Sequence, residues 1–198
     1  MKVEFKNSET KVNLMRAFAG ESQARNRYTF AAAAAKKAGL NVIEGVFLYT
    51  AGQEKEHAEI FFNHLKALDG ENVTIDGSYP IEAYNDILKS LKKAHHNEYE
   101  EYEDIYPKFA EIAEKEGFYA VASSFKQIAQ IEKKHGDRFK KYADKIEMNK
   151  LFKSDEQTEW ICLNCGHVYS GTQALEKCPV CDHDKGYFIR LECSPYES

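Results

Sequence analysis

Residues 8–147 alternate long helix-forming segments with short polar breaks. Three of these segments are followed by a glycine, at the point where a helix end needs a left-handed residue: Gly39, Gly70 and Gly117. Pro80 suits the first turn of a further segment. The pattern predicts four helices, at about residues 8–38, 41–69, 80–116 and 119–147. Pro107 lies inside the third and is expected to kink it, because proline removes one backbone donor.

Only the connection between the second and third predicted helices is long. Helices joined by short turns pack as antiparallel neighbours, and a single long connection is typical of a bundle with one crossover. The first part of the chain is therefore predicted to be an all-α four-helix bundle with one long crossover.

Each predicted helix carries an apolar stripe whose residues repeat at alternating steps of three and four, the spacing of a buried face. In every helix the stripe is interrupted midway by acids, or by an acid and a histidine. These interruptions are Glu21, then Glu54 and His57, then Glu98 and Glu101, and finally Glu132 and His135. A bundle that turns these stripes inward brings five carboxylates and two imidazoles into one layer of its core.

Such a layer requires compensating cations, because even one unpaired buried ion costs several kcal/mol. The same stripes offer no Lys or Arg. A Glu-x-x-His motif on two helices, with a Glu on each of the other two, is the dimetal pattern of helical bundles. A single such motif is usually a solvated pair, but these two recur 78 residues apart. Oxygen-rich ligands with one imidazole per metal suit iron or manganese.

The last part of the chain has a different composition. Residues 155–198 contain all five cysteines and eight acidic against three basic residues, so the net charge of −5 lies there. Two Cys-x-x-Cys pairs with twelve residues between them predict a tetrathiolate metal site: Cys162, Cys165, Cys178 and Cys181. Two disulfides are the competing interpretation, but disulfides are rare in a reducing cytosol. The predicted domains are 1–148 and 158–198, with a linker over 149–157.

Composition also limits the partners. A bulk nucleic-acid binder should carry a basic surplus, and this chain is mildly acidic. The longest apolar run, residues 30–35, is far shorter than the ~20 residues that span a bilayer. The N-terminal segment is too charged for a secretory signal. We therefore expect a cytoplasmic protein that binds neither nucleic acid nor membrane.

The combined motifs resemble those of the rubrerythrins over essentially the whole chain. They read Glu21-Ser-Gln-Ala-Arg-Asn-Arg-Tyr28, Gln53-Glu54-Lys-Glu-His57, Glu98-x-x-Glu101 and Glu132-x-x-His135, followed by the four-cysteine module. The resemblance implies a ferritin-like di-iron bundle fused to a small rubredoxin-like metal ribbon. It also implies a peroxidase that defends the cytoplasm against hydrogen peroxide.

The resemblance further implies individual roles for the site residues. Glu21 and Glu98 match terminal carboxylate ligands, and Glu54 and Glu132 match bridging ones. His135 matches the histidine of one iron, while Glu101 and His57 match a pair that alternate on the other. Tyr28 and Tyr106 match tyrosines that hydrogen-bond to ligand carboxylates.

The implied cofactors are two iron ions in the bundle and one in the four-cysteine site, where spacing alone favours zinc and zinc can be misloaded. Because the chain has no Gly-x-Gly-x-x-Gly fingerprint, electrons are expected from rubredoxin or an NAD(P)H-dependent reductase. A homodimer or higher homo-oligomer is also implied. Two other functions stay open: a ferroxidase or iron-storage protein, and a non-catalytic zinc-ribbon adaptor.

A few further polar residues are given no role in the chemistry. His64 is expected to be a core histidine with a local partner, and His95 to be solvated or at the edge of the site. Cys193 is expected to be packed or merely tolerated, and His167 is redundant beside four cysteines. Arg25 and Arg27 are expected to be exposed helix residues.

Overall fold

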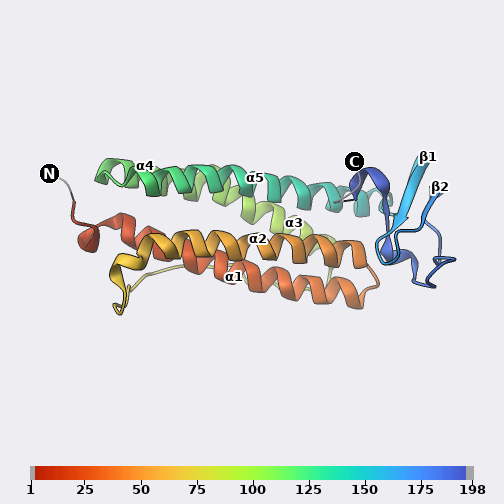
Figure 1. The fold of residues 1–198 in the computed structure, drawn as a ribbon, viewed down its shortest axis with the longest axis horizontal. Coiled ribbons are helices and arrows are strands. Elements are labelled where there is room, and N and C mark those ends of the chain that lie inside the picture. The colour runs from red at the N-terminus through yellow and green to blue at the C-terminus, as the bar shows by residue number, and fades with distance from the viewer. Residues whose placement is uncertain (1–2, 195–198) are drawn as a thin grey trace.

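The computed structural model describes residues 3–194, which form a bundle of long helices with a small sheet at one end (Figure 1). Three rods are single helices, α1 (Glu9–Lys37), α2 (Asn41–Leu65) and α5 (Tyr119–Glu147). The fourth joins α3 (Ile87–Glu100), a π-helical segment (Glu101–Ile105) and α4 (Tyr106–Glu116). The predicted fold class is confirmed. None of the helices described is long and apolar enough to cross a membrane.

The helix ends follow local rules. The Ser8 hydroxyl accepts a hydrogen bond from the backbone N–H of Lys11 at 3.1 Å, which caps the start of α1. The three glycines predicted at helix ends all have positive φ, namely Gly39, Gly70 and Gly117. Only short turns separate α1 from α2 and α4 from α5, so each of these pairs is antiparallel (Figure 1).

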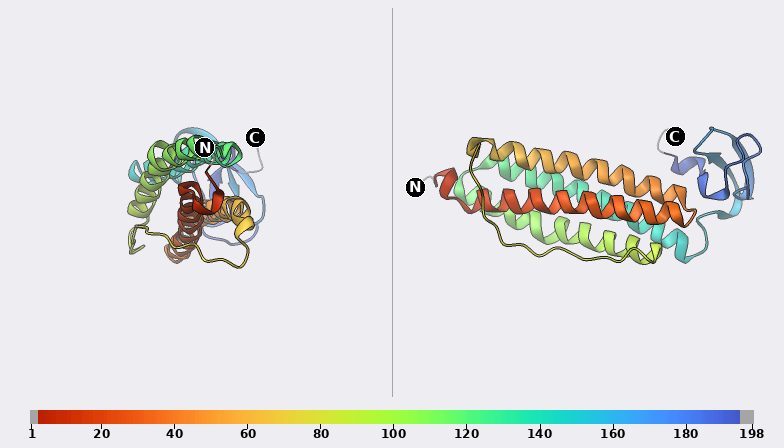
Figure 2. Two further views of the ribbon diagram at one scale, coloured as in Figure 1. Left: turned by 90° about the vertical axis from the view of Figure 1, so that its left-hand side faces the viewer. Right: turned by 90° about the horizontal axis from the view of Figure 1, so that it is seen from below.

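The third rod begins at Ile87, so the predicted start at residue 80 is wrong. Asp86 caps α3 by accepting a hydrogen bond from the backbone N–H of Lys89 at 3.0 Å. Residues 69–86 instead form an extended crossover that runs along the outside of the bundle beside α1 (Figure 2). Glu82 in the crossover pairs with Arg27 of α1 at 3.0 Å, and this contact ties the non-helical segment to the bundle.

A change of winding, rather than a simple interruption, lies next to Pro107. The π-helical segment ends just before this proline, which occupies the first turn of α4. A π-helical hydrogen bond joins residues i and i+5, whereas an α-helical one joins i and i+4. The next residue to face the core therefore lies one position later in the sequence. Accordingly, Tyr106 is 1% exposed, whereas Ile105 is only partly buried. Ile105 lies four residues after Glu101, so the predicted stripe would place it in the core.

The apolar core of the bundle is divided in two by a polar layer. One cluster lies near the sheet and includes Tyr28, Phe47 and Phe139. The other lies toward the opposite end and includes Tyr106 and Phe125. On each rod the interrupting acids fall between the residues of these two clusters. The predicted layer is therefore enclosed by packed apolar side chains above and below.

The four-cysteine module is a three-stranded antiparallel sheet in the order β2-β1-β3. Its strands are β1 (Lys153–Cys162), β2 (Val168–Gln173) and β3 (Phe188–Arg190), and β1 begins within the stretch predicted as a linker. Ile161 and Ile189 belong to the same core cluster as Val42 and Ile43 of α2. The module is thus docked on the end of the bundle, and only residues 148–152 connect the two (Figures 1 and 2).

Gly186 marks the closest approach between the module and the bundle. A Cβ atom at this position would lie 1.9 Å from the carbonyl oxygen of Gly39, in the turn between α1 and α2. We predict that Gly186→Ala lowers the free energy of unfolding by about 1–3 kcal/mol through overpacking. Thermal unfolding with hydrogen exchange at the turn measures this loss.

Gly45→Ala is the matched control, because a Cβ there has no neighbour within 4 Å and the residue lies in the interior of α2. It should leave stability unchanged or raise it by up to about 1 kcal/mol. Equal effects of the two substitutions would contradict the proposed close packing.

Candidate metal centres

The polar layer gathers all seven side chains that the sequence placed in it. Six are at most 5% exposed, namely Glu21, Glu54, His57, Glu98, Glu132 and His135. Two groups of ligand atoms lie within 4.8 Å of one another: the two Glu-x-x-His motifs, and Glu132 with Glu98 and Glu101. Glu101 is partly exposed and occupies the first position of the π-helical segment.

The four fully buried carboxylates fall into two kinds. Tyr106 donates a hydrogen bond to Oε1 of Glu21, and Tyr28 donates one to Oε1 of Glu98. Their Oε2 atoms lack a hydrogen-bond partner in the described structure, as do both oxygens of Glu54 and of Glu132. Two carboxylates thus offer one free oxygen and two offer both. This is the arrangement that two terminal and two bridging metal ligands require.

The imidazoles lie on either side of this carboxylate cluster. Nδ1 of His57 lies 2.8 Å from Glu132 Oε1, and Nδ1 of His135 lies 2.7 Å from the other oxygen of Glu132. Nδ1 of His135 also lies 2.9 Å from Glu54 Oε1. The two rings are nearly parallel, with centroids 5.5 Å apart. The two nitrogens therefore face different oxygens of Glu132, which is compatible with one imidazole per metal.

The ionisation of the cluster shows how strongly it demands positive charge. Burial, with repulsion from neighbouring carboxylates, raises the pKa of Glu21 well above its usual range and that of Glu98 to about 8. Burial alone would lower the pKa of His135, but contacts with Glu132, Glu54 and Glu98 raise it to about 12. Glu21 and Glu98 thus hold protons strongly, and the carboxylates around His135 keep its ring protonated. Two divalent metal ions would supply this charge, and the oxygen-rich donor set fits iron.

A hydrogen-bonded pair outside the ligand set orients His135. The Oε1 atom of Gln53 lies 3.1 Å from His135 Nε2, and Arg138 donates to the same oxygen at 3.1 Å. Arg138 also donates to the Thr50 hydroxyl at 2.9 Å. A ring nitrogen that donates to a fixed oxygen leaves the other free to bind metal. The sequence analysis gave neither Gln53 nor Arg138 a role; the signal for Gln53 was its place in the motif Gln53-Glu54-Lys-Glu-His57.

The four-cysteine site is formed by two matching turns. Sγ atoms of Cys162 and Cys181 lie 3.7 Å apart, and those of Cys165 and Cys178 lie 3.6 Å apart. All four sulfurs fall within 4.8 Å of one another, and all five cysteines of the chain are free thiols. The disulfide interpretation is therefore wrong. This donor set fits a tetrahedral iron or zinc ion.

Both turns use the same backbone pattern. Cys162 N–H donates to the His167 carbonyl, and Cys178 N–H donates to the His183 carbonyl, each at 2.9 Å. Gly166 and Asp182 occupy equivalent positions and both have positive φ. A backbone hydrogen bond from His183, with the neighbouring thiols, lowers the pKa of Cys181 to about 6. The turns thus present N–H groups that stabilise thiolates.

The remaining polar residues lie outside both centres. His64 contacts the Ser124 hydroxyl at 2.9 Å, so it has the expected partner, but it is only partly buried and is not a core residue. His95 contacts the Gly136 carbonyl at 3.0 Å. Cys193 packs against the core cluster shared by the bundle and the module. The expectation for Arg27 is wrong, because it is 8% exposed and paired with Glu82 of the crossover.

The fold and the two donor sets define a ferritin-like dimetal carboxylate bundle with a rubredoxin-like domain. A family model of rubrerythrin matches residues 12–143, and one of the rubredoxin-like domain of rubrerythrin matches residues 160–189. Rubrerythrin from Clostridium perfringens is 47% identical over 184 residues, which cover 92% of this chain and 94% of the relative. The chain belongs to the rubrerythrin family, known as di-iron proteins of oxidative stress.

Further relatives agree with this assignment. Rubrerythrin from Nitratidesulfovibrio vulgaris is 42% identical over 94% of this chain and 96% of its own length. A structure of fully reduced, all-ferrous nigerythrin superposes with a TM-score of 0.62 and 26% identity, over 96% of this chain and 88% of that chain. Symerythrin from Cyanophora paradoxa, reduced with dithionite, has a TM-score of 0.61 over 74% of this chain and 89% of its own. Its 21% identity supports the fold alone.

The two kinds of carboxylate predict different losses of metal. Removing a carboxylate with two free oxygens, as in Glu54→Ala, should abolish binding of both bundle metals, because both ions lose a ligand. Glu21→Ala should mainly weaken one ion. Metal analysis after anaerobic loading with ferrous iron distinguishes these outcomes.

Glu56→Ala provides the control, because this exposed carboxylate lies on the same helix outside the layer. Equal metal loss in Glu54→Ala and Glu21→Ala would contradict the division into bridging and terminal ligands.

Proposed function

We propose that the chain is a non-haem di-iron peroxidase that reduces hydrogen peroxide to water in the cytoplasm. The observation that supports this most is the presence, in one chain, of a dimetal carboxylate layer and a separate tetrathiolate site. Each peroxide consumes two electrons and two protons and yields two water molecules. Two ferrous ions in the layer would supply those electrons, one from each ion.

The protein residues around the layer have distinct tasks in this proposal. Glu54 and Glu132 would hold the two metal ions, because both oxygens of each carboxylate lack a hydrogen-bond partner in the described structure. Gln53 holds the ring of His135 in its binding orientation. The two apolar core clusters on either side of the layer keep bulk water away from it. The lower local dielectric strengthens the electrostatic contacts within the layer.

The tyrosines hold the terminal carboxylates. Burial, together with the nearby carboxylates, raises the pKa of the Tyr28 and Tyr106 hydroxyls well above the usual value. Both hydroxyls therefore remain protonated and donate to Glu98 and Glu21. Each donated bond occupies one oxygen, so the remaining oxygen is directed toward the metal position.

The four-cysteine site would return electrons to the layer, one at a time, from rubredoxin or an NAD(P)H-dependent reductase. Within one chain, the module contacts the bundle near Gly39, at the start of α2. Glu54 lies about 20 Å further along this helix, so electrons would have to cross a long distance to the layer. A homodimer in which the module of one subunit lies near the layer of the other would shorten this transfer. Iron would serve this relay, whereas zinc has no redox chemistry.

The division of labour can be tested with the double variant Cys162→Ser and Cys165→Ser. It should lose the thiolate-bound metal but keep the bundle metals, since the two donor sets share no residue. The reduced variant should consume one equivalent of peroxide in single-turnover absorption measurements, and then fail to turn over with a protein electron donor. Undiminished steady-state turnover would refute the relay. Faster reaction with oxygen than with peroxide would favour the ferroxidase.

Glu101 provides a second test, because a minimal dimetal bundle does not need it. We propose that Glu101 binds one iron in the oxidised state and yields to His57 on reduction, since a ferric ion gains more from a hard anionic oxygen. Glu101→Ala should retain two bundle metals when reduced but lose most peroxidase turnover. If His57 and Glu101 keep the same coordination to iron in structures of both oxidation states, the exchange does not occur.

A further inference from the structure

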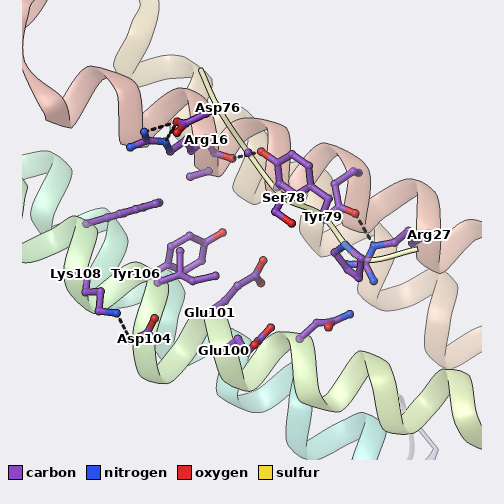
Figure 3. A pocket seen from close by; sticks show the side chains of 18 residues that line it. Arg16, Arg27, Asp76, Ser78, Tyr79, Glu100, Glu101, Asp104, Tyr106 and Lys108 are labelled. Carbon is purple, nitrogen blue, oxygen red and sulfur yellow. Dashed lines mark hydrogen bonds and ion pairs between the residues drawn. The ribbon is translucent and has the colours of Figure 1, made fainter. Parts of the chain in front are cut away.

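A pocket of about 310 Å³ lies between α1, the crossover and the third rod (Figure 3). Its walls include Arg16 and Gly20 of α1 and residues 76–80 of the crossover. Glu101 and Tyr106 of the third rod complete the lining, and the carboxylate of Glu101 points into the space beneath the crossover (Figure 3). The pocket therefore reaches the edge of the metal layer.

Glu101 is the point of contact between the pocket and the predicted ligands. The other six are at most 5% exposed, whereas Glu101 is partly exposed. Among the cavities found in the described residues, this one is lined by both Glu101 and Tyr106, which donates to the terminal ligand Glu21. A molecule in this pocket would therefore reach the metal layer at Glu101, while the other six predicted ligands are buried.

The crossover is fastened over the pocket at both ends. Arg16 binds Asp76 through Nη2 at 2.5 Å, and the Tyr79 hydroxyl donates to the Arg16 carbonyl at 3.2 Å. On the far side, Arg27 pairs with Glu82 at 3.0 Å. The Tyr79 ring covers Gly20, where an added Cβ would lie 3.9 Å from the ring. The ring thus forms the wall of the pocket at α1, and it lies this close to the helix because residue 20 has no side chain.

The charges of the lining select the kind of molecule that enters. Arg16 and Lys108 are each paired with an aspartate, Lys108 with Asp104 at 2.5 Å. The carboxylates of Glu100 and Glu101 add negative charge. Paired cations and nearby carboxylates disfavour anions, so the lining suits a small, neutral, polar molecule.

We propose that this pocket is the route by which hydrogen peroxide reaches the metal layer, and that Tyr79 and Gly20 set its size limit. The assignment of peroxide rests on the proposed function, while the route itself rests on the geometry. Small neutral hydroperoxides enter the pocket beside the Tyr79 ring and reach Glu101, and bulky ones are excluded.

Gly20→Leu tests the route by filling the pocket from its α1 wall. Oxidation of the reduced, iron-loaded protein by hydrogen peroxide should slow by about tenfold, or about 1.4 kcal/mol of activation free energy. The cobalt(II)-loaded protein gives a readout without turnover. Hydroxylamine is neutral and of similar size to hydrogen peroxide, and its binding, followed by cobalt absorption, should slow in parallel.

Gly52→Leu is the matched control. It lies two residues before a ligand of α2, as Gly20 lies one residue before a ligand of α1, and an added Cβ has no neighbour within 4 Å. Both of its rates should equal those of the parent. Parental rates in Gly20→Leu with full metal content would overturn the route.

Tyr79→Ala tests the size limit independently and stays informative if Gly20→Leu does not fold, because Tyr79 is 38% exposed. Its rate with tert-butyl hydroperoxide should rise relative to that with hydrogen peroxide. An unchanged ratio would refute the limit. If the parent protein is inert toward peroxide while Gly20→Leu still slows hydroxylamine binding, the route stands and the peroxidase function fails.

Discussion

The structure depends on the cost of burying carboxylates in an apolar bundle. Four glutamates and two histidines lie in the core with at most 5% exposure, and most of their ligand atoms have no hydrogen-bond partner in the described structure. Unpaired buried charge is strongly destabilising, so the layer needs bound protons or metal cations to offset the charge of its carboxylates. The two apolar clusters hold it in place, and each contributes one tyrosine that donates a hydrogen bond to a carboxylate of the layer.

The layer could be predicted from the sequence because helical periodicity is a strict constraint. A charged residue that replaces an apolar one on a stripe must face the core as long as the helix is regular. This logic placed Glu21, Glu54, Glu98 and Glu132 correctly. It failed just beyond Glu101, where the π-helical segment adds a residue and turns Tyr106 inward in place of Ile105. A step of five residues is not part of the pattern that identifies a helix.

The other errors came from contacts between distant segments. Pro80 is acceptable at a helix start, yet residues 80–86 stay extended, with Glu82 paired to Arg27 of α1. Arg27 looked like a solvated residue because its partner lies 55 positions away. The change in composition near residue 155 indicated a second module but not its docking, which buries Ile161 and Ile189 against the bundle. Local patterns carry no information about such pairings.

The irregular parts of the bundle coincide at one side of the metal layer. The rods α1, α2 and α5 are continuous helices, whereas the third rod changes winding at Glu101 and the extended crossover passes over the same place. A regular α-helix holds each side chain in a fixed position. A metal ligand that is proposed to move, such as Glu101, is therefore best placed where the backbone departs from α-helical geometry. The pocket beneath the crossover lies at the same place. The predicted ligand Glu101 thus combines a non-α-helical backbone with a position on the lining of a pocket.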